Sequence, residues 1–224
     1  IEHTAWWLHI LGIYAFMNYL PYSKHLHIIL AFPNAYYAPL IPKGQMHNMP
    51  SIQNEVLYAM QPELAPTNAA APEKFGARDV MDLSWKNLMD AYSCTECGRC
   101  SAACPANITG KLLSPRKIMM DTRDRITEIG KNIDLHGKDF KDDKSLLDQY
   151  VSREELWACT TCNACADACP VNINPVDIIV QMRQYLVMEQ SAAPSELNSM
   201  FTNMENNGAP WQFNPNDKAN WTNV

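Results

Sequence analysis

The sequence has no excess of basic charge and no glycine-rich motif that would cradle a nucleotide. Aspartate and glutamate number 24 against 18 lysines and arginines, so the formal net charge is -6. We therefore expect no nucleic-acid partner, because nucleic-acid-binding surfaces need clustered positive charge. Without the glycine motif, we expect any flavin to lie on a partner or on sequence outside this chain.

Strand signals are weak throughout the chain, which predicts an all-α fold. Residue 1 is not an initiator Met, and no signal-peptide cleavage pattern precedes it. We expect the chain to be a piece of a longer protein.

Formal charge is missing from Thr4 to Ser23, whereas nearly every third residue is charged from Arg116 to Glu155. About 20 mainly apolar residues are needed to span a bilayer. Trp6, Trp7 and Tyr22 are suited to its interfaces. This contrast predicts a membrane-spanning helix at the beginning, running on through the apolar residues after it, and a solvated second half.

The eight cysteines form two copies of the motif C-x-x-C-x-x-C-x-x-x-C-P, each copy within 11 residues. Disulfide frameworks scatter their cysteines to join distant loops, so this spacing argues against disulfides. Zinc knuckles use paired C-x-x-C, and a redox dithiol needs only two cysteines, so the third cysteine would be surplus in both cases. The motif predicts two [4Fe–4S] clusters.

In such double motifs the fourth cysteine ligates the other cluster. All eight thiolates are then used, which leaves no open iron site for a substrate and indicates electron transfer between single-electron carriers. The expected ligands of the first cluster are Cys94, Cys97, Cys100 and Cys169, and those of the second cluster are Cys159, Cys162, Cys165 and Cys104.

Each motif is followed by the same helix-start signal. Ser114 precedes Pro115 in the first half, and Asn174 precedes Pro175 in the second. A side-chain oxygen at the N-cap satisfies a free backbone N–H, and proline is favoured at the first helical position. These signals predict two pseudo-symmetric helical halves.

The gap of 55 positions from Cys104 to Cys159 is long for a compact bacterial ferredoxin. It resembles the gap in the α-helical ferredoxin domain of succinate dehydrogenase and fumarate reductase iron–sulfur subunits. We predict four regions: a membrane or membrane-proximal segment over 1–45, a linker over 46–79, the di-cluster ferredoxin domain over 80–191, and an irregular tail over 192–224.

His9 and His27 are 18 positions apart, which is five whole turns and about 27 Å on an unbroken helix, so both would face the same way. The stretch "LPYSKHLHI" resembles the cytochrome b (gamma) subunit of respiratory nitrate reductase and the membrane subunit of heterodisulfide reductase. The resemblance implies the last helix of a cytochrome b bundle, with His9 and His27 as ligands of b-type haem. The partner histidines would lie outside this chain.

Together, "CTECGRCSAACPANITGKLLSPRKI" and "LWACTTCNACADACPVNINPVDIIVQMRQYLVM" resemble the membrane-bound heterodisulfide-reductase-like oxidoreductases. That family includes electron transfer flavoprotein:menaquinone oxidoreductases. The resemblance implies electron flow between the flavoprotein, or another cytoplasmic redox protein, and a b-haem and menaquinone pool. It places the chain at the bacterial inner membrane with the cluster domain on the cytoplasmic side.

Two other classes stay open at this point. One is a peripheral iron–sulfur subunit without haem, in a heterodisulfide-reductase-like or anaerobic dehydrogenase complex. The other is a zinc-stabilised interaction module. Iron and zinc analysis separates the second from both electron-transfer hypotheses.

Overall fold

The computed structural model describes residues 1–65, 74–212, 214, 217 and 219–223. Within these ranges all regular structure is helical, and one isolated β-bridge joins Leu147 to Val151, so the all-α prediction is confirmed. The elements are α1 (Glu2–Tyr19), η1 (Leu20–Tyr22), α2 (Leu26–Tyr36), α3 (Pro50–Met60), η2 (Pro62–Leu64), η3 (Val80–Asp82), α4 (Trp85–Ser93), α5 (Arg99–Ala102), α6 (Pro105–Ile108), α7 (Pro115–His136), α8 (Leu146–Gln149), α9 (Arg153–Ala158), α10 (Ala164–Asp167), α11 (Pro175–Gln184), the π-helical η4 (Tyr185–Glu189), α12 (Ser195–Asn207) and η6 (Asn220–Asn223).

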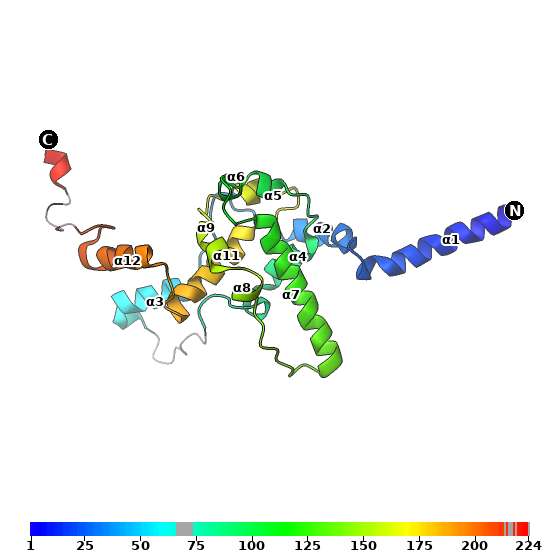
Figure 1. Ribbon diagram of the computed structural model, residues 1–224, viewed down its shortest axis with the longest axis horizontal. Helices are drawn as coiled ribbons and strands as arrows, with labels where there is room; N and C mark the ends of the chain where they lie inside the picture. Colours follow the sequence, from blue (N-terminus) through cyan, green and yellow to red (C-terminus); the bar gives the residue numbers. More distant parts are fainter. Residues whose placement is uncertain (66–73, 213, 215–216, 218, 224) are drawn as a thin grey trace.

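The core lies where α7 packs against α4 and α11, and the short helices that carry the cysteine motifs cover one end of it (Figure 1). Burial of these apolar side chains is the main stabilising term of the body. The fully buried members include Ile118, Met119, Leu156, Ile178, Ile179, Met182 and Leu186.

Both predicted helix starts are confirmed. The side chain of Ser114 accepts a hydrogen bond from the backbone N–H of Lys117, and that of Asn174 accepts one from Val176. Ser84 caps α4 in the same way, in a reciprocal pair with Asn87. The caps fix where each helix leaves its cysteine loop.

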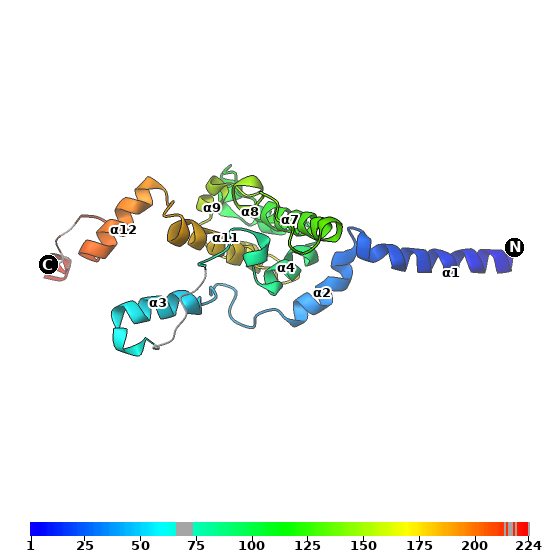
Figure 2. The same ribbon diagram turned by 90° about the horizontal axis from the view of Figure 1, so that it is seen from below.

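The prediction of one long membrane helix over Thr4–Ser23 is not met. Helix α1 ends at Tyr19. The short helix η1, which contains Pro21, and the extended residue Ser23 separate it from α2. Over the part of the chain that the structure describes, no helix combines the length and the apolar character needed to cross a membrane. Helix α1 buries none of its residues and extends away from the body (Figures 1 and 2).

Helix α2, which lies in the segment over 1–45 predicted to be membrane-spanning or membrane-proximal, does not continue in the direction of α1 but packs on α4. Asn34 is completely buried there, donating to the carbonyl of Val171 at 2.9 Å and accepting from Lys86 at 3.0 Å. Ser93 donates to the carbonyl of Leu30. A buried amide with both ends hydrogen-bonded fixes this docking.

Two predicted irregular regions contain helices. Helix α3 and η2 lie inside the predicted linker over 46–79, of which residues 66–73 are outside the described residues. Helix α12 lies in the predicted tail, beginning after Pro194 and ending at Gly208, whose φ is +63°. The fixed φ of proline and the left-handed glycine are ordinary helix boundary signals that composition alone hides.

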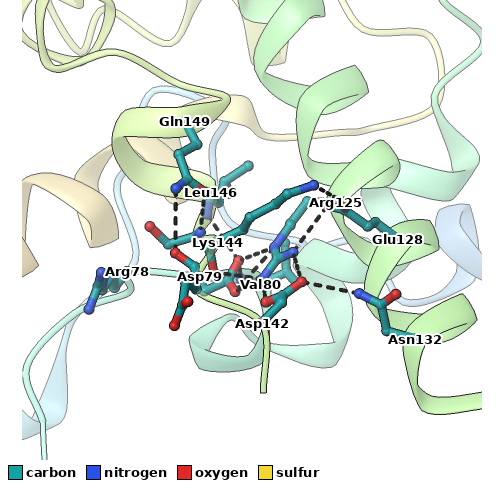
Figure 3. Close-up of polar contacts among 12 residues, drawn as sticks. Arg78, Asp79, Val80, Arg125, Glu128, Asn132, Asp142, Lys144, Leu146 and Gln149 are labelled. Atoms are coloured by element: carbon teal, nitrogen blue, oxygen red, sulfur yellow. Dashed lines mark hydrogen bonds and ion pairs between the residues drawn. The ribbon is translucent and has the colours of Figure 1, made fainter. Parts of the chain in front are cut away.

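A charged cluster ties the insertion between the two motifs to α7 (Figure 3). The guanidinium of Arg125, only 1% exposed, makes two-pronged contacts with Asp79 and Asp142, the shortest at 2.7 Å in each case. It also donates to the carbonyl of Lys144 at 2.7 Å and to Glu128 at 3.1 Å. One buried arginine therefore joins the start of the body, α7 and the insertion.

Glu128 makes the stability that this charged cluster contributes depend on pH. Hydrogen bonds from Lys144, Tyr150 and Arg125 lower the pKa of its carboxyl from 4.5 to about 2. A carboxyl with a lowered folded-state pKa contributes stability that is complete above pH 4.5 and is lost as pH falls towards 2. We expect Glu128→Gln to unfold at a lower temperature than the wild type at about pH 6, with a smaller difference at about pH 3.

Thermal unfolding of both proteins, followed by circular dichroism at each pH, measures the difference between their unfolding temperatures. Destabilisation by acid that is common to both proteins cancels in that difference. The matched control is Asp139→Asn, an exposed carboxylate of the same insertion. A difference between wild type and Glu128→Gln that stays constant with pH would contradict the assignment.

Gly76 is a position where no other residue fits. Its φ is +70°, and an added Cβ would lie 2.3 Å from the carbonyl oxygen of Gln181 and 2.5 Å from the backbone nitrogen of Tyr185. We expect Gly76→Ala to lower the free energy of unfolding by about 3 kcal/mol, from left-handed strain plus overpacking against backbone. Thermal unfolding tests this against Gly44→Ala, whose Cβ meets nothing within 4 Å; equal midpoints would refute it.

Candidate metal centre

Each cysteine motif winds through two left-handed residues at equivalent places. Glu96 and Gly98 have φ of 55° and 79° in the first motif, and Thr161 and Asn163 have 55° and 58° in the second. Left-handed residues turn the chain sharply and let successive backbone N–H groups face inward. The two loops therefore have the same backbone path, as the repeat predicts.

The first expected ligand set surrounds one cavity. Its lining includes all four thiols together with Met119, Val171 and Ile173. The motif's own three cysteines are thus joined by the fourth cysteine of the other motif. The thiols concerned are Cys94, Cys97, Cys100 and Cys169.

In the second expected set, Cys104 and Cys162 lie close enough to Cys159 to raise the pKa of its thiol, and Cys159 and Cys104 do the same for Cys165. Cys165 also borders the first cavity, and the nearby Cys100 contributes to raising the pKa of its thiol. Helices α5 and α10 pack together between the motifs, so the two ligand sets adjoin.

Burial makes four of these thiols less acidic. It raises the pKa of Cys94, Cys100 and Cys159, and it raises that of Cys165 to about 12. The exposed Cys97 is the opposite case, because the backbone N–H of Arg99 lowers the pKa of its thiol. Metal binding must displace the protons that burial holds in place, which couples cluster insertion to pH.

The residues present fit [4Fe–4S] clusters. All eight cysteines are free of disulfides, and backbone N–H groups of Thr161 and Ile173 donate to the sulfurs of Cys159 and Cys169 at 3.4 Å. Across the described residues, no three His, Cys, Asp or Glu side chains lie close enough to hold one metal ion. A cubane is larger than a single ion, so its thiolate ligands stand farther apart than the ligands of zinc.

The predicted haem residues lie on different helices. His9 is exposed on α1, while His27 is on α2, where its Nδ1 lies 2.8 Å from the carbonyl of Lys24. The in-phase relation assumed an unbroken helix, and the break at η1 removes that assumption. The structure therefore does not bring His9 and His27 onto one face.

Sequence reasoning missed the charged residues beside the cysteines. Arg123 bonds Glu96 at 2.7 Å, and Lys24 bonds the same carboxylate at 3.0 Å. Arg183 donates to the backbone carbonyls of Leu156 and Cys159. Aligning the two halves by their Ser-Pro and Asn-Pro starts would have revealed both arginines, because they occupy the same repeat position.

Comparison with protein families supports the cluster assignment. Two family models, both described as a 4Fe-4S dicluster domain, match the chain, one over residues 93–173 and the other over 50–109. The first match spans both motifs and the insertion between them. The chain therefore contains a 4Fe–4S dicluster domain with ligands for two clusters.

The relatives that match nearly the whole chain are oxidoreductases. The chain is 30% identical over 99% of its length to the probable iron-sulfur-binding oxidoreductase FadF of Bacillus subtilis, and 31% identical over 98% to the EtfAB:quinone oxidoreductase of Syntrophomonas wolfei. It is 32% identical, over 53% of its length, to one subunit of the ferredoxin/F(420)H(2)-dependent CoB-CoM heterodisulfide reductase of Methanosarcina acetivorans, and it covers 60% of that polypeptide. The chain spans about a third of the length of the first two relatives, at 33% and 31%.

Proposed function

We propose that this 4Fe–4S dicluster chain, related to iron–sulfur oxidoreductases, conducts electrons between an electron transfer flavoprotein and a quinone. The observation that carries the proposal is the arrangement of the eight thiols in two adjoining sets, with Cys165 of one set bordering the cavity of the other. Bound clusters would supply reversible one-electron redox chemistry. The chain's own residues would hold the clusters side by side, and Met119, Val171 and Ile173 would cover the first cluster with apolar side chains.

The donor and acceptor are proposed from a relative. The relative from Syntrophomonas wolfei is named for the flavoprotein and for quinone. Its match covers 98% of this chain. Menaquinone is the quinone that we propose for a bacterial pathway of this type. Any flavin would lie on the partner or on sequence outside this chain, because the chain has no nucleotide-binding glycine motif.

A test begins with the chain carrying its clusters, prepared without oxygen. Reduced flavoprotein is mixed with it, and the loss of visible cluster absorbance is followed; a menaquinone analogue is then added to restore the absorbance. Reduction by the flavoprotein and reoxidation by the quinone support the proposal. Clusters that are present but exchange electrons with neither reagent overturn it.

The second candidate is a haem-free iron–sulfur subunit of a heterodisulfide-reductase-like complex. The match to the heterodisulfide reductase polypeptide from Methanosarcina acetivorans favours it. In this case a physiological heterodisulfide reductase partner would reoxidise the clusters and the quinone analogue would not. Iron and zinc analysis comes first, because zinc without iron would exclude both electron-transfer functions.

The membrane half of the predicted route is a separate proposal. Its support is the sequence pattern around His9 and His27, which resembles the haem-binding helix of cytochrome b subunits. It implies a bacterial inner-membrane location with the cluster domain on the cytoplasmic side. A pyridine haemochrome spectrum of the whole protein tests it, and a spectrum without b-type haem would overturn it.

A further inference from the structure

The two halves of the dicluster domain place an arginine at the same position. Arg123 stands eight positions after Pro115, and Arg183 stands eight positions after Pro175. Each arginine is held close to the first cysteine of its own motif: Arg123 pairs at 2.7 Å with Glu96, two positions after Cys94, and Arg183 donates to the backbone carbonyl of Cys159. The repeat thus provides one cation beside each cluster site.

Arg183 is held without a carboxylate. Its guanidinium lies over the ring of Trp157, 5.0 Å from the centroid, and its Nε donates to the carbonyl of Leu156 at 3.0 Å. Its Nη2 donates to the carbonyls of Leu156 and Cys159. No acidic side chain among the described residues lies within ion-pair distance of it. The partly buried charge is stabilised by carbonyl dipoles and the ring of Trp157, with no carboxylate paired to it.

Arg123 is held differently. Its Nη1 pairs with the carboxylate of Glu96 at 2.7 Å, and its Nε lies 3.6 Å from Asp124. The side chain of Glu96 is only 14% exposed, so little solvent weakens this pairing. Lys24, which also bonds Glu96, is 71% exposed and its charge is screened. The cation beside the first cluster is thereby neutralised.

The difference between the halves comes down to one repeat position. Glu96 follows Cys94 by two positions and Thr161 follows Cys159 by two, and both have φ of 55°. The same turn therefore carries a carboxylate in the first half and a hydroxyl in the second. Three other charged residues close to the cysteines are exposed: Arg99, Arg116, which borders the first cavity, and Asp167 in the second motif.

A cation close to a cluster favours the reduced form, which has one more negative charge, and this effect is strong where solvent screening is weak. We infer that Arg183 tunes the second cluster by raising its reduction potential, and that Glu96 cancels the equivalent effect of Arg123 on the first cluster. The inference rests on the proposed cluster function but not on the identity of the electron donor or acceptor.

The test is a redox titration of both clusters by electron paramagnetic resonance, with iron content measured for each variant. We expect Arg183→Gln to lower the midpoint potential of the second cluster alone, and Arg183→Lys to keep it near the wild-type value. Thr161→Glu, which places a carboxylate as in the first half, should lower the same potential and serves if Arg183→Gln fails to assemble its clusters. Glu96→Gln should raise the potential of the first cluster.

Arg123→Gln alone should lower the first potential, because it leaves the carboxylate of Glu96 uncompensated. The matched control is therefore the double variant Arg123→Gln with Glu96→Gln, which removes both charges and should leave the first potential near the wild-type value. Unchanged potentials in Arg183→Gln and Thr161→Glu, with iron for both clusters retained, would overturn the tuning role and leave the cluster proposal intact. A wild-type potential of the second cluster in Arg183→Lys, beside a lowered potential in Arg183→Gln, would show that the charge at this position matters and not the packing of the side chain. An equal shift in Arg183→Lys and Arg183→Gln would also overturn it.

Discussion

Cys169→Ser is expected to abolish the first cluster while the second cluster remains, although Cys169 belongs to the second motif. The reason is the cavity lined by Cys169 together with Cys94, Cys97 and Cys100. The reciprocal change, Cys104→Ser, should remove the second cluster, because Cys104 lies close enough to Cys159 and Cys165 to raise the pKa values of their thiols. Each variant should lose about half of the iron, because each cubane has its own four thiolates.

Matching spectra identifies which cluster is lost. Cys169→Ser should lose the same electron paramagnetic resonance signal as Cys97→Ser, whereas Cys104→Ser should lose the same signal as Cys162→Ser. Ser101→Ala, beside the ligands of the first motif, is the control and should retain both signals. If Cys169→Ser instead matched Cys162→Ser, each motif would hold its own cluster and the crossed ligation would be wrong.

Arg125→Leu is expected to destabilise the fold by about 3 kcal/mol, the low end of the cost of breaking a buried ion pair, because it leaves the half-buried carboxylates of Asp79 and Asp142 without their buried cation. Asp79 and Asp142 each lose a two-pronged partner, and the carbonyl of Lys144 loses its donor. The insertion that separates the two motifs would lose its main attachment to α7. We expect a lower thermal midpoint and faster proteolysis between residues 137 and 145.

Arg153→Leu is the matched control for this change. Arg153 also makes a two-pronged pair, with Asp148 at 2.8 and 3.0 Å, but both side chains are exposed, at 44% and 48%. Surface pairs of this kind contribute about 0–1 kcal/mol, so its midpoint should hardly move. Equal midpoints for Arg125→Leu and Arg153→Leu would show that the buried cluster does not hold the insertion.

Local signals in the sequence predicted much of the dicluster body. The proline starts at Pro115 and Pro175 and the cap at Ser114 are short-range features, and the structure has helices beginning at each. The apolar faces that include Ile118 and Ile178 were also visible, because helical periodicity is written in consecutive residues. The spacing of the cysteines indicated two clusters, and the family match over 93–173 agrees.

The beginning of the chain was predicted less well, because a run without charge is compatible with several environments. The same apolar residues form α1, which buries nothing, and α2, which packs on α4 through the buried Asn34. Pro21 was visible in the sequence, but whether a proline bends or ends a helix depends on what its neighbours contact. The prediction that His9 and His27 face the same way assumed one unbroken helix, and the structure places them on the separate helices α1 and α2.

The sequence by itself determined the ligand types, the duplication and the helix starts, since each depends on residues a few positions apart. Only the tertiary structure decided which charges meet. Arg125 reaches Asp79 across 46 positions, and Arg123 reaches Glu96 across 27. Arg183, by contrast, meets backbone carbonyls and the ring of Trp157 but no carboxylate among the described residues. The three arginines are alike in the sequence; their partners differ because packing selects the side chains that surround each one, and burial makes those charges strong.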